Sequence, residues 1–367
     1  MKIVVTGSNG FIGKNLCATL REHDQYEVYE VNRDTSEKDF QSYLSSADFL
    51  FHLAGVNRPE ETSEFVIGNV DLTLRIVKTL QKFKRNIPIV FSSSVQAEQD
   101  NPYGKSKLEA EEVIQNYSKS TGALHYIYRL PNVFGKWCKP NYNSFIATFC
   151  NNIMNGSEIS INNPNSPVNL VYIDDVCASW LKILAGKVKP GFNEVPVVFN
   201  TTVGEVADII GSFKASQTTL ITEPVGVGLY RALYATYLSY THPKNFSYKL
   251  VSHTDERGVF CEMLKTHNSG QFSFFTAHPG VTRGGHYHHT KAEKFLVIKG
   301  KAKFGFRNIL TGEKHSITTS GDNPEIVDTV PGWSHDITNV GSDDLMVMLW
   351  ANEIFNPEKP DTQAAIV

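Results

Sequence analysis

The chain lacks the features that would direct it to a membrane, to nucleic acid or to an oxidising compartment. Among its 367 residues no run approaches the roughly 18 apolar residues of a membrane span, and residues 3–5 are too short for the apolar core of a signal peptide. The net charge of −3 excludes the basic excess of a protein that coats nucleic acid or anionic membrane. Its five cysteines have no CxxC spacing, so we expect ordinary thiols in a cytoplasmic protein.

Length and composition predict two folded domains, since hydrophobic residues make up 41% of the chain and charged residues 20%. In the first half, short apolar runs alternate with amphipathic stretches, which favours a Rossmann-type, doubly wound parallel α/β sheet. The expected strands are residues 2–5, 27–31, 49–53, 87–91 and 125–128. The expected helices include residues 13–22 and 105–118.

Beyond about residue 245 the pattern changes to short β-like runs separated by Gly, Pro, Asn and Asp. Such regular short strands predict an all-β barrel or sandwich. The runs are residues 272–276, 294–298, 303–307 and 345–350. We therefore expect one domain over residues 1–245 and a second over residues 246–367.

A glycine-rich turn follows the first expected strand. Gly7, Gly10 and Gly13 form GxxGxxG between a strand and a helix, where backbone N–H groups can approach a pyrophosphate. The second strand ends at Asn32 and Arg33, which can accept the 2′-phosphate of NADP where an NAD site usually has a carboxylate. The residues expected to contact the dinucleotide are Gly7, Gly10, Phe11, Ile12, Gly13, Asn32, Arg33, Leu53, Ala54, Tyr103 and Lys107.

A serine, a tyrosine and a lysine form the candidate proton-transfer group of the first domain. Tyr103 and Lys107 are four residues apart, on one face of an expected helix. An ammonium beside a phenol lowers the pKa of the phenol, so Tyr103 can move a proton near neutral pH. Ser94 ends the serine cluster 92–94 and would hydrogen-bond the reacting carbonyl.

Together these motifs make residues 1 to about 245 resemble an extended short-chain dehydrogenase/reductase. The matching strings are GxxGxxG, HLAG (52–55), SSS (92–94), YxxxK (103–107), RLPNVFG (129–135) and VYIDDV (171–176). The resemblance implies a nucleotide-sugar substrate, with Asn132 helping to seat it. The dehydratase branch carries Thr-Asp-Glu where this chain has Ser94-Val95-Gln96, so the resemblance favours reduction of a 4-keto sugar.

The second domain contains a histidine cluster at residues 286–289 and a further histidine far downstream. His288, Glu293 and His335 form a nitrogen and oxygen donor set suited to Zn²⁺ or another divalent transition metal. The spacing G-x5-HxH-x4-E-x6-G, followed by G-x2-H-x3-N, resembles the two motifs of the cupin family. That resemblance implies a cupin barrel that holds a metal.

Two further strings, DERGVF (255–260) and RGGHY (283–287), resemble signatures of the cupin-fold dTDP-sugar 3,5-epimerases. In that family the histidine at the position of His286 is the general base, and arginines at the positions of Arg257 and Arg283 bind substrate. Those epimerases lack the metal motif, so His286 is ambiguous between base and ligand. We assign His286 to the base and His288, Glu293 and His335 to the metal.

The order of the two domains resembles that of bifunctional enzymes of capsular polysaccharide synthesis. The resemblance implies a homodimer in which the cupin domain epimerises C3 of a UDP-2-acetamido-2,6-dideoxy-4-keto-hexose. The first domain would then reduce C4 with NADPH, giving UDP-2-acetamido-2,6-dideoxy-L-talose on the route to UDP-N-acetyl-L-fucosamine. Three alternatives stay open: a cupin that is only a dimerisation or structural module, an Fe²⁺ dioxygenase fused to a reductase, and an NADP-sensing regulator.

Overall fold

The computed structural model describes residues 1–245 and 247–367. It contains two compact units, Met1–Ile210 with Arg231–Thr241, and Gly211–Tyr230 with His242–Val367. Helices α8 (Val203–Thr219) and α9 (Gly228–Leu238) therefore each contribute residues to both units. No helix within the described residues is long and apolar enough to cross a membrane.

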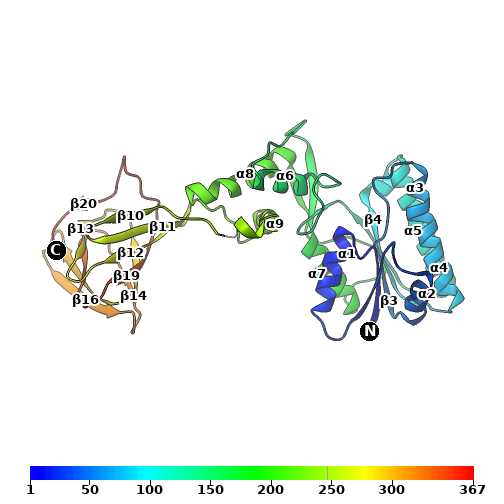
Figure 1. Ribbon diagram of the computed structural model, residues 1–367, viewed down its shortest axis with the longest axis horizontal. Coiled ribbons are helices and arrows are strands. Elements are labelled where there is room, and N and C mark those ends of the chain that lie inside the picture. The colour runs from blue at the N-terminus through cyan, green and yellow to red at the C-terminus, as the bar shows by residue number, and fades with distance from the viewer. Residues whose placement is uncertain (246) are drawn as a thin grey trace. The chain divides into compact units, whose positions relative to one another are not determined.

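The first unit is built on a parallel sheet with strand order β2-β1-β3-β4-β5-β8. Helices α1 and α7 lie on one face of this sheet, and α2, α4 and α5 lie on the other (Figure 1). The expected doubly wound α/β sheet is therefore confirmed. Its strands are β1 (Lys2–Thr6), β2 (Glu27–Val31), β3 (Phe49–His52), β4 (Ile89–Ser94), β5 (His125–Leu130) and β8 (Gly191–Asn193).

The remaining elements of this unit surround the sheet. The α-helices are α1 (Phe11–Arg21), α2 (Glu37–Ser46), α3 (Ser63–Phe65), α4 (Leu72–Lys82), α5 (Pro102–Thr121), α6 (Phe145–Met154), α7 (Ile173–Leu184) and α9 (Gly228–Leu238). The shorter helical turns are η1 (Val66–Asp71) and η2 (Val95–Glu98), and η3 (Pro243–Asn245) follows in the second unit. A small second sheet has the order β6 (Asn132–Phe134), β7 (Pro167–Tyr172) and β9 (Phe199–Thr202).

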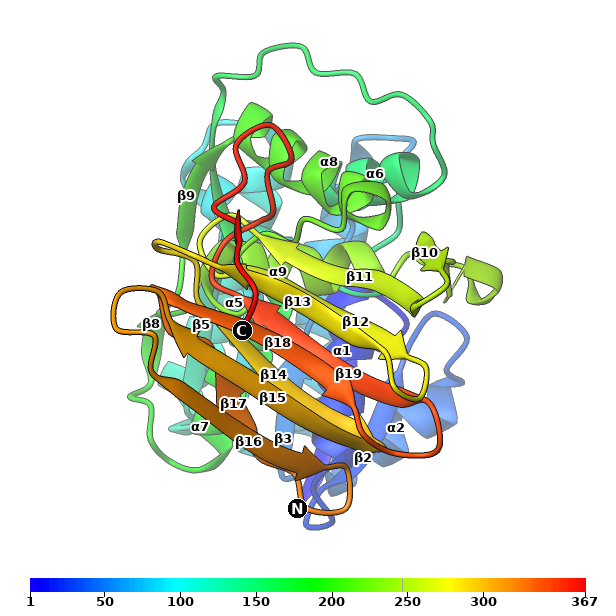
Figure 2. The ribbon, with the colours of Figure 1, turned by 90° about the vertical axis from the view of Figure 1, so that its left-hand side faces the viewer.

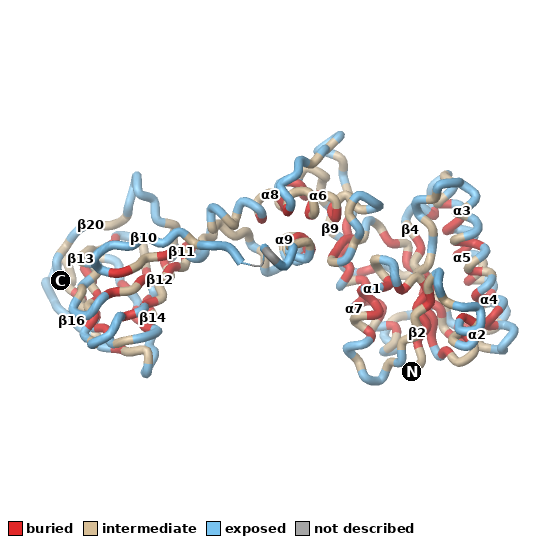
Figure 3. The backbone as a smooth tube through the Cα atoms, viewed as in Figure 1, coloured by how far each residue is buried: buried red, intermediate tan, exposed pale blue. Residues whose placement is uncertain are grey.

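Local sequence explains why the central elements form where they do. All four residues of β3, Phe-Leu-Phe-His, are buried, as expected of a central strand covered by helices on both faces (Figure 3). Helix α5 begins where the Asn101 side chain accepts a hydrogen bond from the N–H of Gly104 at 2.8 Å, with Pro102 in its first turn. It ends at Gly122, whose φ of +76° suits a left-handed cap.

The second unit consists of two antiparallel sheets, with strand orders β10-β11-β12-β19-β14-β17 and β16-β15-β18-β13-β20 (Figure 2). Phe275 and Phe295 from the first sheet share one buried core with Phe304 and Ile337 from the second. Two sheets that share a core in this way confirm the all-β unit expected from the sequence. The strands of the first sheet are β10 (Ser252–Asp255), β11 (Gly258–Thr266), β12 (Gly270–Ala277), β14 (Glu293–Lys299), β17 (Ile326–Asp328) and β19 (Leu345–Ala351). Those of the second are β13 (Thr282–Tyr287), β15 (Lys301–Asn308), β16 (Lys314–Ser320), β18 (Trp333–Asn339) and β20 (Gln363–Ala364).

The serine cluster 92–94 lies within strand β4, whereas the strand expected from the sequence ends at residue 91. Strand β4 continues to Ser94 because residues 92–94 pair with residues 128–130 of β5. The candidate catalytic serine is therefore held by the central sheet at the end of a strand. In open parallel sheets this carboxyl edge is where ligands bind.

Candidate functional site

The turn between β1 and α1 packs tightly at two glycines. A Cβ at Gly13 would lie 2.2 Å from the carbonyl oxygen of Gly7, and a Cβ at Gly7 would lie 2.8 Å from the backbone of Ala54. Gly7 also has φ of +70°, which favours glycine. Helix α1 begins at Phe11 directly after this turn, so its first N–H groups can bind a pyrophosphate.

The end of β2 adjoins the same turn, since the N–H of Gly7 donates to the carbonyl of Val31 at 2.8 Å. The Asn32 side chain is occupied locally, because its Oδ1 accepts from the N–H of Asp34 at 2.9 Å. Arg33 is exposed. Of the pair predicted to select NADP, Arg33 is therefore the charged residue whose side chain is exposed to solvent.

A chain of hydrogen bonds orders the loop that follows β3. Thr6 Oγ1 accepts from the N–H groups of Leu53 and Ala54 at 3.1 and 3.2 Å, so its own proton goes to His52 Nδ1 at 2.8 Å. His52 Nε2 then donates to Thr73 Oγ1 at 2.9 Å, and Thr73 donates onward to a backbone carbonyl. Burial lowers the pKa of His52 to about 3, which keeps it neutral, as this chain requires. We did not predict from the sequence that His52 orders this loop, although His52 is the first residue of the HLAG string (52–55).

The candidate proton-transfer residues come from neighbouring elements. Ser94 ends β4, and Tyr103 and Lys107 lie one turn apart on α5. The Lys107 ammonium is buried, donates to the carbonyl of Ser92 at 2.6 Å and lies 4.3 Å from the ring centre of Phe91. Burial lowers the pKa of Lys107 to about 8, although the charge of Glu111 opposes this shift.

The direction of the Tyr103 pKa differs from the sequence expectation. Burial raises the pKa of Tyr103 above its ordinary value, and a hydrogen bond with Ser94 only partly offsets the rise. The expected lowering by Lys107 was wrong for this structure, because desolvation raises the pKa of the phenol and Lys107 is not among the groups that shift it. Tyr103 is therefore a protonated phenol at neutral pH, the form that donates a proton.

A buried carboxylate connects the elements that carry these residues. Glu111, fully buried one turn beyond Lys107, accepts from the Ser93 hydroxyl and from the Arg129 guanidinium, with Nε at 3.0 Å and Nη2 at 2.7 Å. Arg129 Nη1 also donates to Glu98 at 2.7 Å. The hydrogen bonds of Glu111 and Arg129 thus connect α5, β4, β5 and η2. The sequence did not lead us to predict this ion pair, although Glu111 is four residues from Lys107 and Arg129 begins the string RLPNVFG (129–135).

Ser94, Tyr103 and Lys107 line a cleft of about 850 Å³. Two aromatic residues that sequence reasoning did not assign to the site, Trp137 and Tyr142, also line it, and the Tyr142 hydroxyl donates to Asn57 at 3.2 Å. Asn32, Arg33 and Ala54 are not among the described lining residues. The predicted residues that do line the cleft are Gly7, Gly10, Phe11, Ile12, Gly13, Leu53, Ser94, Tyr103, Lys107 and Asn132.

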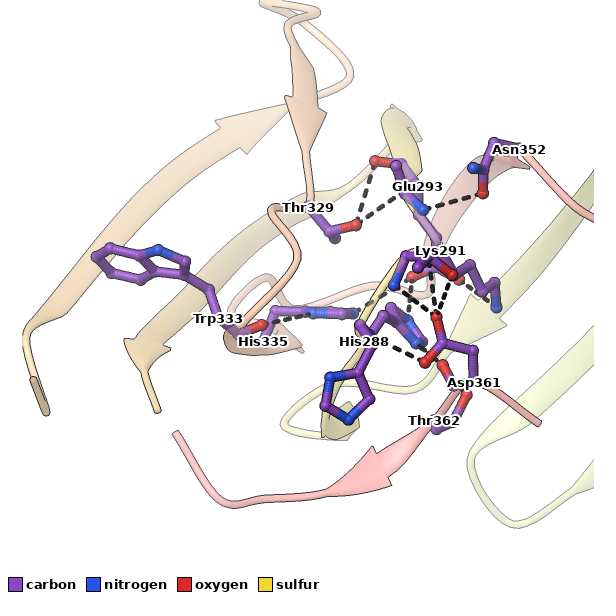
Figure 4. A network of polar contacts seen from close by, with 12 residues as sticks. His288, Lys291, Glu293, Thr329, Trp333, His335, Asn352, Asp361 and Thr362 are labelled. Carbon is purple, nitrogen blue, oxygen red and sulfur yellow. Dashed lines mark hydrogen bonds and ion pairs between the residues drawn. The ribbon is translucent and has the colours of Figure 1, made fainter. Parts of the chain in front are cut away.

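In the second unit, the antiparallel sheets bring together a compact group of donor atoms. His286 lies opposite His335 in the β13–β18 pairing, and His288 and Glu293 complete the group, with all ligand atoms within 4.8 Å of one another. Glu293 Oε2 lies 3.3 Å from Nε2 of both His288 and His335 (Figure 4). Nε2 of His335 is buried without a hydrogen bond of good geometry. A divalent cation at this point would satisfy these atoms, so the residues fit the predicted metal.

His286 is less buried than the other three residues of the group. Burial, together with the neighbouring imidazoles of His335 and His288, lowers the pKa of His286 to about 4. The ring is therefore neutral at pH 7. A neutral imidazole can accept a proton or bind a metal, so the geometry is compatible with both roles considered for His286.

The two arginines predicted to bind substrate differ in their polar contacts. Arg257 is paired with Asp255, whose pKa its hydrogen bonds lower to about 2. Arg283 is mostly buried, and its Nε and Nη2 have no hydrogen-bond partner among the described residues. Its Nη2 lies 4.0 Å from Asp255 Oδ1, and its guanidinium lies 5.3 Å from the ring centre of Phe275. Arg283 thus keeps N–H donors that are free to bind an anionic ligand.

Comparison with known families assigns both units. Residues 3–195 match the NAD dependent epimerase/dehydratase family, and residues 253–363 match the polysaccharide biosynthesis C-terminal domain. The first match covers more than half of the chain, which therefore belongs to the NAD dependent epimerase/dehydratase family. A nicotinamide cofactor is characteristic of this family.

The similarity to particular proteins extends over the whole chain. UDP-2-acetamido-2,6-beta-L-arabino-hexul-4-ose reductase from Pseudomonas aeruginosa is 55% identical, over 100% of this chain and 99% of that protein. The crystal structure of the capsular polysaccharide assembling protein CapF from Staphylococcus aureus has a TM-score of 0.94 and 44% identity, with full coverage of both chains. The predicted resemblance to enzymes of capsular polysaccharide synthesis is thus confirmed. UDP-glucuronic acid 4-epimerase from Bacillus cereus shares the fold alone, with 18% identity and a TM-score of 0.56 over 65% of this chain.

The lowered pKa of Lys107 makes a prediction about stability. Between pH 8 and 10.5 the unfolded chain keeps the Lys107 proton while the native state loses it. The free energy of unfolding of the first unit should therefore rise with pH in this window, by up to about 1.4 kcal/mol per pH unit. Denaturant titrations at several pH values should show this slope in the wild type and its loss in Lys107→Met.

Lys105→Met is the matched control. Lys105 is on the same helix but exposed, and its hydrogen bond with Asp100 raises its pKa, so it stays protonated in this window. This variant should keep the wild-type slope. Equal slopes in Lys107→Met and wild type would show that Lys107 titrates normally.

Proposed function

We propose that the chain is a bifunctional nucleotide-sugar enzyme of capsular polysaccharide biosynthesis. Residues 246–367 epimerise C3 of a UDP-2-acetamido-2,6-dideoxy-4-keto-hexose, and residues 1–245 then reduce its C4 ketone with NADPH. The product is UDP-2-acetamido-2,6-dideoxy-L-talose, on the route to UDP-N-acetyl-L-fucosamine. The observation that carries the reductase part is the cleft with Ser94, Tyr103 and Lys107, in a chain 55% identical to a named 4-keto-sugar reductase.

The residues of the first unit supply the proton for reduction. NADPH, when bound, supplies hydride to C4. The hydroxyl of Tyr103, protonated because burial raises its pKa, donates its proton to the C4 oxygen as negative charge develops there. Ser94 holds the same oxygen by a hydrogen bond, and the positive charge of Lys107 stabilises the phenolate that remains.

The chemistry of the sugar sets the order of the two steps. A proton can be removed from C3 only while C4 is a ketone, because the carbanion must delocalise onto the C4 oxygen as an enolate. Epimerisation therefore precedes reduction. Neutral His286 accepts the C3 proton in this proposal. Arg283, whose Nε and Nη2 have no hydrogen-bond partner among the described residues, binds an anionic part of the substrate.

His288, Glu293 and His335 are the residues that would hold Zn²⁺ in the second unit. A bound zinc ion would stabilise negative charge on an oxygen of the substrate. In this proposal His286, the least buried of the four donors, is left to act as the base. A homodimer, implied by the resemblance to bifunctional capsular enzymes, stays a prediction.

Hydrogen exchange at C3 tests the epimerase part directly. Tyr103→Phe, incubated in D₂O with the UDP-linked 4-keto sugar and no NADPH, should incorporate deuterium at C3, because proton abstraction does not require the reductase site. The double variant Tyr103→Phe/His286→Ala should lose this exchange. Proton NMR of the sugar is the measurement.

Two results would argue against this part of the proposal. If Tyr103→Phe takes up no deuterium while the wild type consumes NADPH with the same sugar, the second unit is a structural or dimerisation module. If the double variant exchanges at the rate of Tyr103→Phe, another residue is the base.

The proposed preference for NADPH depends on Arg33. Loss of a charge-assisted contact with the 2′-phosphate costs about 1.5–3 kcal/mol. We therefore expect Arg33→Ala to raise the KM for NADPH by roughly 10- to 100-fold and to leave that for NADH nearly unchanged. Steady-state kinetics with both cofactors is the measurement.

The exposed Lys38 on α2 gives the matched control, and Lys38→Ala should keep the NADPH preference. An unchanged ratio of the two KM values in Arg33→Ala would mean that other groups select the cofactor.

A further inference from the structure

The C-terminal residues 361–366 lie along β13, next to the donor group of the second unit. Strand β20 pairs with β13, with His286 opposite Ala364 and Tyr287 opposite Gln363. The N–H of Ala365 also donates to the carbonyl of Gly285 at 2.9 Å. The Arg307 side chain donates to the carbonyl of Ile366 at 2.7 Å. This C-terminal segment is thus held to the sheet at several successive residues.

Asp361, the first residue of this segment, caps the turn that joins two predicted ligands, His288 and Glu293. Its Oδ1 accepts from the N–H of His289 at 2.9 Å. Its Oδ2 accepts from the N–H groups of Thr290 and Lys291 at 2.7 and 2.9 Å, and from the Thr290 hydroxyl at 2.9 Å (Figure 4). These donors lower the pKa of Asp361, so its carboxylate is charged at neutral pH.

The same residue sets the proton position on His288. The backbone carbonyl of Asp361 accepts a hydrogen bond from His288 Nδ1 (Figure 4). In the neutral ring the proton then lies on Nδ1, and Nε2 carries the lone pair. Nε2 is the atom that faces Glu293 Oε2 at 3.3 Å, where a metal would bind.

The capped turn also orients Glu293. Lys291, whose N–H is bound by Asp361, places its ammonium 2.9 Å from Glu293 Oε1. One carboxylate oxygen is therefore occupied, and the other, Oε2, faces the imidazoles of His288 and His335. Asp361 thus contributes to the orientation of two of the three predicted ligands.

We propose that Asp361 is a positioning residue that preorganises His288 and Glu293 for a divalent transition metal. This inference rests on the metal site of the proposed function. Partners that orient metal ligands without touching the ion typically contribute 10- to 100-fold to affinity. Asp361 is 68 positions beyond Glu293 in the chain, so only the fold brings its side chain to the turn.

The affinity of the full-length protein for Zn²⁺ tests this proposal without an activity assay. Titration in competition with a chromophoric zinc chelator should give roughly 10- to 100-fold weaker binding for Asp361→Ala than for wild type. Asp361→Asn keeps one acceptor oxygen and should lie between them. Glu358→Gln removes an exposed carboxylate three residues earlier and should match wild type.

Two further readouts separate positioning from a general loss of structure. NADPH binding in the first unit and the thermal unfolding of metal-free Asp361→Asn should stay close to wild type, while zinc release to the chelator becomes faster. Wild-type affinity in both Asp361 variants, or an equal loss in Glu358→Gln, would overturn the role of Asp361 and leave the metal site standing. No zinc binding by the wild type would overturn the metal site itself, and this inference with it.

Discussion

A buried carboxylate organises each of the two units. Removing one partner of a buried ion pair typically costs about 3–5 kcal/mol, because the remaining charge stays desolvated. Glu111 is fully buried in the first unit. Its two carboxylate oxygens accept hydrogen bonds from the Arg129 guanidinium, and one of them also accepts from the Ser93 hydroxyl. The segments that carry these groups must therefore dock together. Because Ser94 and Lys107 lie on those segments, the ion pair also holds the site together.

Glu293 has a different set of partners in the second unit. One of its oxygens is paired with Lys291, and the other lies between two imidazole nitrogens. A divalent cation bound between this oxygen and the two Nε2 atoms would compensate its charge. Glu111 thus has a structural role, since its partners neutralise and hydrogen-bond both of its oxygens. Glu293 and its two imidazole neighbours instead form a group that fits a divalent cation. The same residue type thus has different roles because of the charges around it.

Much of the fold and of the candidate sites could be predicted from local sequence. The glycine spacing, the four-residue interval of Tyr103 and Lys107, and the two-residue interval of His286 and His288 follow directly from helix and strand geometry. Glu293 and the distant His335 could be predicted as metal ligands only because the sequence resembles the two cupin motifs. The structure brings all four predicted cupin residues together.

What the sequence did not reveal depends on contacts between distant segments or on burial. Arg129 binds Glu111 across 18 positions, and Asp361 caps a turn some 70 positions earlier. Neither pair has a local pattern that would identify it. The pKa of Tyr103 was predicted in the wrong direction because spacing gives the neighbour of a group but not its desolvation.

The proposed function requires two chemically linked sites in one chain. Product analysis of Tyr103→Phe, His286→Ala and an equimolar mixture of the two, each with NADPH and the UDP-linked 4-keto sugar, tests it most directly. Neither variant alone should form the C3-inverted, C4-reduced sugar, and the mixture should form it, because each variant supplies the step that the other lacks. Formation of that product by His286→Ala alone at the wild-type rate would contradict the claim.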